Sequence, residues 1–326
     1  MNILNRREFI QRATAAGVSL SLPVMASGPV SAADKTSNKF MPTRTIPSSG
    51  ESLGVIGYSS ARTFTKNSIE DNATHKSLLK TLIETGGNYI DTDTVSENNI
   101  AGWLNEMGSL NKTFMGSSLG IGYKITGPAA EEMQQSLNIR GKEALDLVQV
   151  RHLVDMENRW PVMREWKDAG KVRHLGITSG HYSEYIKLEA TMKKYQPDFI
   201  QVNYSILEPE AEERILPLAS DLGIAVVSSR PFLILPSISL MNYGNPQKGL
   251  YFGTVNNYPL PEWATEFDCE SWAQFSLKYI LANSNVTCVL TETKSPVEVR
   301  DHLQAAFGRL PDDTQLKRMR EHIKFL

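Results

Sequence analysis

The chain has 326 residues, a formal net charge of −2, 41% hydrophobic residues and two cysteines. The near-neutral charge excludes a strongly basic surface of the kind that binds nucleic acid or an acidic membrane. Cys269 and Cys288 lack the spacing of a metal site, and Cys288 lies in an apolar run. A disulfide is possible in an oxidising compartment, but the apolar run around Cys288 favours a buried thiol.

The first residues carry an arginine pair, Arg6 and Arg7, followed by Phe9, a mildly apolar stretch at 13–25 and the small-residue run 30–32. This pattern is typical of a twin-arginine signal, which export machinery reads as an address. The apolar stretch is too short for a stable membrane span. An ordinary cytosolic tail with two chance arginines is the alternative.

Three segments follow from this interpretation. We expect a signal peptide at 1–33, a linker at 34–43 and a single α/β domain at 44–326. The twin-arginine export machinery would carry the folded protein, with any cofactor already loaded, to the periplasm. No membrane anchor would remain after the signal is cleaved.

From residue 52 onward, short β-rich runs alternate with amphipathic helical stretches. Eight such units predict a (β/α)8 TIM barrel, with a doubly wound sheet as the competing fold. A short N-terminal hairpin at 44–51 is expected to cap the barrel bottom, and a helix is expected near the C-terminus. The expected strands are 53–58, 88–91, 113–118, 146–152, 172–178, 198–203, 225–229 and 287–291. The expected helices are 72–85, 98–107, 129–138, 161–169, 182–194, 212–222, 272–283 and one from 296.

Several of these runs resemble the aldo/keto reductase family in both content and order. Gly-Lys-Val-Arg-His-Leu-Gly-Ile-Thr-Ser at 170–179 is similar to its fifth strand, Asp-Phe-Ile-Gln-Val-Asn-Tyr-Ser at 198–205 to its sixth, and 223–232 to its seventh. Cys-Val-Leu-Thr-Glu-Thr-Lys at 288–294 resembles the eighth strand and the adenosine-phosphate loop. The Arg-Pro-Phe at 230–232 is most similar to the exported bacterial branch.

The resemblance implies reduction of carbonyl compounds with hydride from NADP(H), which needs a positioned acid. The family uses an Asp, a Tyr, a Lys and a His. Here the Asp position is Asp91, whereas the other three positions fall on Ser96, Ser118 and Arg151. A serine hydroxyl is a poor proton donor, and an arginine holds an anion without acting as an acid. The catalytic tetrad is therefore predicted to be degenerate.

Strand alternation places Arg151 toward the barrel mouth, where it would pair with Asp91, and turns His152 toward the helices. A bulge in this strand would instead bring His152 inward and restore a histidine. Tyr58 and Tyr123 are candidate replacement acids, and Lys124 lies beside Tyr123. The alternative is that Tyr58 packs in the core and Lys124 is solvated.

The resemblance also implies a nucleotide site. Thr178, Ser179 and Gln201 fall on positions that hold the nicotinamide amide, while Ser229 replaces a tyrosine that stacks on the ring. Near the expected 2′-phosphate lie Thr293 and Lys294, with Arg300 in support, beside a helix start at 296. Capping or solvated side chains are the alternative for these last three residues.

Three functions remain open from the sequence. The first is a working reductase with a rearranged acid. The second is a non-catalytic barrel (a pseudoenzyme) that binds an anionic small molecule or a partner protein. The third is an unassigned enzyme activity at the same mouth, since a fold alone does not fix function.

Overall fold

The computed structural model describes residues 40–60, 72–93, 96–232 and 255–325, which belong to one compact unit at Asn38–Leu326. The predicted signal peptide and most of the linker lie outside the described residues. So do residues 233–254, which lie between the expected strand at 225–229 and the expected helix at 272–283.

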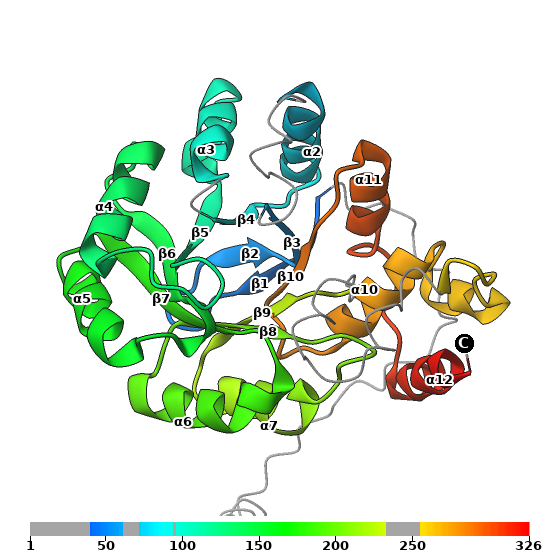
Figure 1. The fold of residues 1–326 in the computed structure, drawn as a ribbon. Coiled ribbons are helices and arrows are strands. Elements are labelled where there is room, and N and C mark those ends of the chain that lie inside the picture. The colour runs from blue at the N-terminus through cyan, green and yellow to red at the C-terminus, as the bar shows by residue number, and fades with distance from the viewer. Residues whose placement is uncertain (1–39, 61–71, 94–95, 233–254, 326) are drawn as a thin grey trace, which may run out of the picture. The chain divides into compact units, whose positions relative to one another are not determined.

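Eight parallel strands close into a barrel in the order β10-β3-β4-β5-β6-β7-β8-β9, which confirms the predicted fold (Figure 1). Nearly every residue of these strands is buried, because the barrel interior covers one face and helices cover the other. The strands are β3 (Ile56–Ser59), β4 (Tyr89–Thr92), β5 (Phe114–Leu119), β6 (Leu145–Val150), β7 (Val172–Ser179), β8 (Phe199–Asn203), β9 (Ala225–Ser229) and β10 (Cys288–Thr291).

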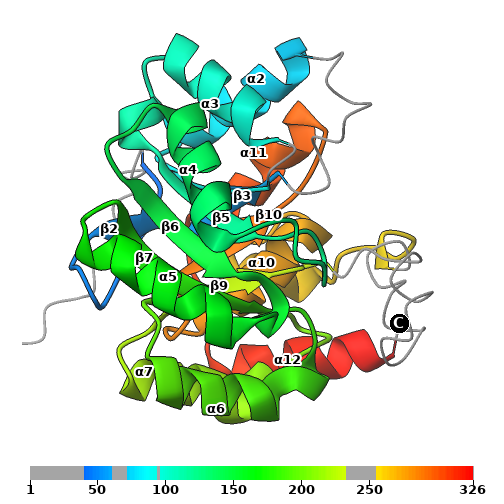
Figure 2. The ribbon, with the colours of Figure 1, turned by 60° about the vertical axis from the view of Figure 1, so that its left-hand side comes forward.

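Helices follow the strands and surround the barrel (Figures 1 and 2). Their apolar faces pack on the outer face of the strands in one large hydrophobic cluster. They are α2 (Asn72–Glu84), α3 (Glu97–Glu106), α4 (Ala129–Arg140), α5 (Met156–Asp168), α6 (Tyr185–Tyr195), α7 (Ala211–Asp221), α10 (Trp272–Ala282), α11 (Pro296–Gln304) and α12 (Asp313–Lys324). In the described part of the chain, no helix is long and apolar enough to cross a membrane.

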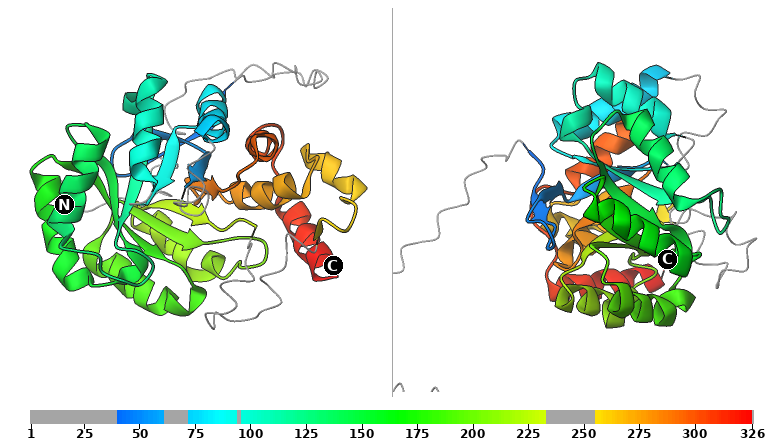
Figure 3. Two further views of the ribbon diagram at one scale, coloured as in Figure 1. Left: turned by 45° about the horizontal axis from the view of Figure 1, so that its top comes forward. Right: turned by 90° about the vertical axis from the view of Figure 1, so that its left-hand side faces the viewer.

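The predicted N-terminal hairpin is present as β1 (Thr43–Thr45) paired with β2 (Ser52–Gly54). It contributes Ile46 and Leu53 to the apolar cluster inside the barrel, so it closes the bottom (Figure 3). The expectation of one strand at 53–58 was wrong: the hairpin ends at Gly54, and the barrel strand starts at Ile56. The apolar run continues across Val55 and hides this boundary.

A buried network secures the C-terminal helix α12 to the barrel wall. Glu212 of α7 accepts hydrogen bonds from Tyr204 (2.7 Å), from Tyr279 of α10 (2.6 Å) and from Arg320 of α12 (2.5 Å). Both cysteines are free and buried, as expected for Cys288.

Candidate active site at the barrel mouth

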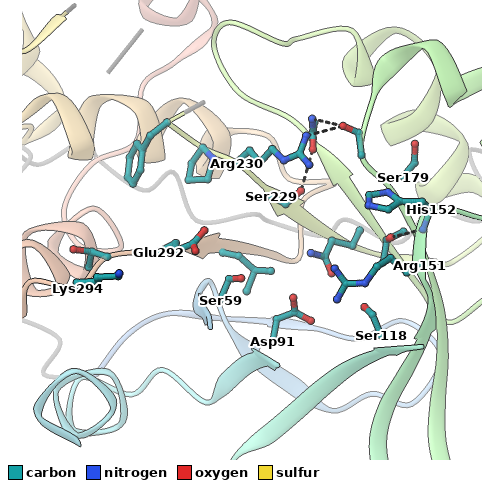
Figure 4. A pocket seen from close by; sticks show the side chains of 18 residues that line it. Ser59, Asp91, Ser118, Arg151, His152, Ser179, Ser229, Arg230, Glu292 and Lys294 are labelled. Carbon is teal, nitrogen blue, oxygen red and sulfur yellow. Dashed lines mark hydrogen bonds between the residues drawn. The ribbon is translucent and has the colours of Figure 1, made fainter. Parts of the chain in front are cut away.

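A cavity of about 350 Å³ opens at the carboxyl ends of the strands, the end at which barrel enzymes carry their sites. Alternate residues of each strand point inward, and those nearest the carboxyl ends reach the cavity (Figure 4). Among the predicted site residues, those that line it are Asp91, Ser118, Arg151, His152, Thr178, Ser179, Gln201, Ser229, Thr293 and Lys294.

Asp91, on β4, is a buried carboxyl group at the floor of this cavity. Its hydrogen bond from Gln149 Nε2 is long, at 3.4 Å. Burial raises the pKa of Asp91 to about 6, while Arg151 and a hydrogen bond from Gln201 act in the opposite direction. In the described part of the chain no direct ion pair joins Asp91 to Arg151, so the predicted pair is a through-space interaction.

Gly116 of β5 leaves the space beside its Cα atom to the Tyr89 and Asp91 side chains. A Cβ atom at this position would lie 2.8 Å from the Tyr89 hydroxyl and 3.2 Å from Asp91 Oδ1. The Tyr89 hydroxyl is fully buried and has no hydrogen-bond partner in the part of the chain that the structure describes. Asp91 therefore lies on an aromatic layer that offers its charge little solvation, which is why its pKa rises.

The strand that carries Arg151 ends earlier than predicted. β6 stops at Val150, and a tight turn follows in which His152 (φ 49°) and Leu153 (φ 55°) adopt left-handed conformations. This turn directs both Arg151 and His152 into the cavity, so the expectation that His152 faces the helices was wrong. Burial, followed by the charges of Arg151 and Arg230, lowers the pKa of His152 to about 4.

His152 has one contact through its ring and one through its backbone. Tyr123 stacks on it with ring centroids 4.3 Å apart, and its backbone N–H donates to Thr178 Oγ1 at 2.9 Å. The loop that carries Tyr123 is fastened by Glu132, which accepts from Gly120 N at 2.7 Å and from Arg159 at 3.1 Å. Tyr123 therefore positions the histidine.

Several of the predicted residues do not line the cavity. Ser96 is fully buried at the start of α3, where its hydroxyl lies 2.7 Å from Ser60 Oγ and bonds Asp93. Tyr58 is buried and donates its hydroxyl proton to the Thr293 carbonyl at 2.5 Å, which matches the packing alternative. Lys124 is exposed, in agreement with the solvated alternative.

The predicted nicotinamide-binding residues begin beside the β6 turn, where Thr178 accepts from the His152 backbone N–H, and continue along β8 and β9. Thr178, Ser179, Gln201 and Ser229 line one wall, and Gln201 Oε1 accepts from Gln149 Nε2 at 3.0 Å. The Ser229 hydroxyl donates to the carbonyl of Val202. Because residue 229 is a serine, this position provides no aromatic ring that could stack on a nicotinamide.

At the adenosine end, Thr293 performs a structural role beside the helix N-terminus. Its hydroxyl donates to Glu298 and accepts from Ser295 N–H at 3.0 Å. Lys294 is exposed at the cavity rim and remains the cation nearest to this end of the site, while Arg300 does not line the cavity. The described residues hold no cluster of His, Cys, Asp or Glu side chains that could bind a metal ion.

Sequence reasoning missed four polar lining residues: Ser59, Asn203, Arg230 and Glu292. All four lie at or just after the carboxyl ends of barrel strands, so the strand boundaries themselves were the available signal. Arg230 follows β9 in a left-handed conformation (φ 56°), and its Nη1 donates to the Gly180 carbonyl at 2.8 Å.

The fold and this cavity define a (β/α)8-barrel protein with a polar ligand site at its mouth. The profile described as the aldo/keto reductase family matches residues 56–324. The chain belongs to the aldo/keto reductase family.

Sequence relatives are distant. The chain is 25% identical over 213 residues to the NADH-specific methylglyoxal reductase of Escherichia coli (strain K12), covering 58% of this chain and 63% of that protein. It is 26% identical over 173 residues to the aldo-keto reductase YhdN of Bacillus subtilis (strain 168), covering 48% and 51%. The chain thus spans about half to two thirds of the length of the curated relatives that it matches.

Solved structures support the fold. The aldo-keto reductase AKR11C1 from Bacillus halodurans, in its holo form, superposes with a TM-score of 0.65 at 20% identity, covering 87% of this chain and 96% of that one. An aldo-keto reductase structure described as PA4992 from Pseudomonas aeruginosa gives a TM-score of 0.60 at 16% identity, covering 81% and 94%.

Proposed function

We propose that this protein is a nicotinamide-nucleotide-linked oxidoreductase that reduces a small carbonyl compound at the barrel mouth, with NADP(H) as the nucleotide. One observation carries the proposal. The four residues at nicotinamide-binding positions, Thr178, Ser179, Gln201 and Ser229, line the same cavity as the buried acid Asp91. A nucleotide held by that wall would present its ring to a substrate beside Asp91.

The residues present fit a nicotinamide group on the polar side. Hydroxyl and amide side chains, which can pair with the carboxamide of the ring, line this wall. The stacking ring is missing because Ser229 occupies its position. We therefore expect binding that is weaker than in a site with an aromatic partner, because stacking contributes about 0.5–1.5 kcal/mol.

Asp91 is the proposed proton donor. Carbonyl reduction adds a hydride to carbon and a proton to oxygen, and a bound nicotinamide nucleotide supplies the hydride. Asp91 in its neutral form donates the proton to the carbonyl oxygen as the C=O π bond breaks, and its carboxylate is then reprotonated from solvent. A pKa near 6 suits a general acid working close to neutral pH. Arg151 stabilises the charge that develops on that oxygen.

Nucleotide titration tests the proposal. Purified protein is titrated with NADPH and with NADH while intrinsic fluorescence is followed, and turnover is then measured with methylglyoxal and pyruvate. Micromolar NADPH binding with turnover is the expected result. Lys294→Gln should weaken NADPH at least threefold and leave NADH unchanged. No binding of either nucleotide at millimolar concentration would overturn the proposal.

A second candidate is a non-catalytic barrel that binds an anionic small molecule. It is supported by the Ser118 and Arg151 positions, which lack the lysine and histidine of the family mechanism, and by the burial of Ser96 away from the cavity. Nucleotide-independent binding of an anion, with no turnover of any carbonyl compound, would favour this candidate.

We also propose export of the folded protein to the periplasm by the twin-arginine machinery, on the basis of Arg6 and Arg7. Replacing both arginines by lysine should retain the full-length protein in the cytoplasm. Unchanged export after this replacement, measured by cell fractionation, would contradict the proposal.

A further inference from the structure

We propose that Arg151, His152 and Arg230 form a carboxylate subsite, so that the substrate is a 2-oxo acid, in which a carboxylate is bonded directly to the reacting carbonyl. This inference rests on the proposed function, because it names the substrate class of the same site. It adds Arg230, and it assigns His152 to binding the substrate's anionic group.

Two of these side chains converge over Gly180. A Cβ atom at Gly180 would lie 2.9 Å from His152 Nδ1 and 3.5 Å from Arg230 Nη2. The absence of a side chain there leaves room for both groups to face the same space. Arg230 is fixed in this position by its 2.8 Å hydrogen bond to the Gly180 carbonyl.

Donor atoms at this point lack protein partners. Arg151 Nε, a donor, and His152 Nδ1, which is a donor in one tautomer, are both buried without a hydrogen-bond partner among the described residues. Leaving a buried polar atom unpaired is unfavourable unless a ligand or water completes it. The two atoms are carried by a turn with left-handed non-glycine residues, which costs about 1–3 kcal/mol per residue. An oxygen ligand that accepts from Arg151 Nε would offset part of this cost.

The position of the cluster relative to Asp91 selects the type of anion. Figure 4 shows Arg151 directed into the cavity beside Asp91, with His152 and Arg230 beyond it. A carboxylate held by the cluster would leave a directly bonded carbonyl group between the cluster and Asp91. Neutral Asp91 does not repel such an anion, whereas ionised Asp91 does.

Calorimetric titration with oxamate, a 2-oxo acid mimic that is not reduced, tests this inference without nucleotide. Wild-type protein should bind oxamate, and methyl oxamate, which lacks the charge, should bind at least tenfold more weakly. Arg151→Gln and Arg230→Gln should each weaken oxamate at least tenfold, since each removes a charge-assisted hydrogen bond. Lys124→Gln, which removes an exposed cation from the neighbouring loop, should stay within twofold of wild type. Circular dichroism establishes that each variant is folded.

Three results would overturn the inference. Methyl oxamate could bind as tightly as oxamate, both arginine variants could bind oxamate normally, or inorganic phosphate could bind more tightly and lose affinity in the same variants. The last result would make the cluster a phosphate site. Oxamate binding that depends on both arginines, in a protein that binds no NADPH, would support the subsite and refute the oxidoreductase proposal.

Discussion

The two ends of the barrel treat buried carboxylates in opposite ways. At the bottom, Asp146 of β6 forms direct ion pairs with Lys142 (2.7 Å) and Arg173 (2.7 Å), and Arg173 also pairs with Glu51 beside the hairpin. At the mouth, Asp91 of β4 receives hydrogen bonds only from the neutral amides of Gln149 and Gln201 and has no direct ion pair among the described residues. The buried carboxylate at the bottom therefore has two cations as direct partners, whereas burial raises the pKa of the carboxyl group at the mouth.

This difference separates stability from function within one fold. Through Arg173, the ion pairs at the bottom connect Asp146 of β6 to Glu51 of the hairpin. Removing one charge from such a group leaves its partners with fewer opposite charges and lowers stability. An unpaired buried carboxyl group lowers stability at neutral pH, yet it supplies an acid with a pKa near the working pH. The comparison predicts that substitutions at the two ends change different observables.

The largest effect is expected at Asp91. Asp91→Asn removes the proposed acid, so kcat should fall by about 10²–10⁴-fold, in the range typical for loss of a general acid. Ser118→Ala, a neighbouring lining residue without a charge, is the control and should stay within threefold. Equal activity in wild type and Asp91→Asn, measured with saturating NADPH, would exclude Asp91 as the donor.

The same substitution should stabilise the protein. Asp91 has a folded pKa near 6 against about 3.8 unfolded, so the native state binds more protons between these values and stability falls as pH rises through that window. Above pH 6 the cost is about 3 kcal/mol. Asp91→Asn should raise the melting temperature at pH 8 and change it little at pH 4; a lower melting temperature at pH 8 would refute this account.

At the bottom, Asp146→Asn should reduce the free energy of unfolding by about 1–3 kcal/mol, because Lys142 and Arg173 each lose one charged partner and keep the Thr113 carbonyl and Glu51. Urea denaturation measures this change. Nucleotide affinity should remain within twofold, since the residue lies at the opposite end. A large loss of affinity without loss of stability would contradict the division between the two ends.

A smaller effect is expected where the Tyr123 loop is fastened. Arg159→Met removes the bonds to Glu132 and to the Gly127 carbonyl (3.2 Å), so the unfolding free energy should fall by about 1–3 kcal/mol. The loosened loop should also raise the substrate KM severalfold. Unchanged KM would show that the loop does not position His152.

The smallest effect is expected at Tyr123 itself. Tyr123→Leu removes the ring stacked on His152, which contributes about 0.5–1.5 kcal/mol, whereas Tyr123→Phe keeps it. The leucine variant should bind oxamate about threefold more weakly, and the phenylalanine variant should match wild type. Equal affinities in all three proteins would make the stacking incidental.

The sequence was sufficient to predict the barrel, because eight β/α units repeat a simple burial pattern. The family resemblance placed Asp91, Ser118, Gln201 and Ser229 at the mouth, and all four line the cavity. Strand alternation was applied to Arg151 and His152. The alternation pattern failed at His152, because β6 ends at Val150 and the chain then turns through left-handed conformations. Residues other than glycine seldom adopt these conformations, so the sequence does not indicate the turn.

Two other features depend on contacts between distant segments. Ser96 enters a hydrogen-bonded cluster with Ser60 and Asp93, which sequence spacing does not reveal. The lack of a direct ion pair at Asp91 depends on which side chains of β5, β6 and β8 reach it. No single segment of the sequence encodes that arrangement. From the sequence, Arg230 was recognised only as part of the Arg-Pro-Phe motif of the family. Its position directly after β9 places its side chain in the lining of the cavity.

The pH dependence of NADPH-dependent pyruvate reduction tests the central claim most directly. With Asp91 as the acid, kcat/KM should be constant below pH about 6 and then fall tenfold per pH unit, as neutral Asp91 disappears. Asp91→Asn should lack this limb. A rate that stays level or rises to pH 9, or the same limb in Asp91→Asn, would contradict the account.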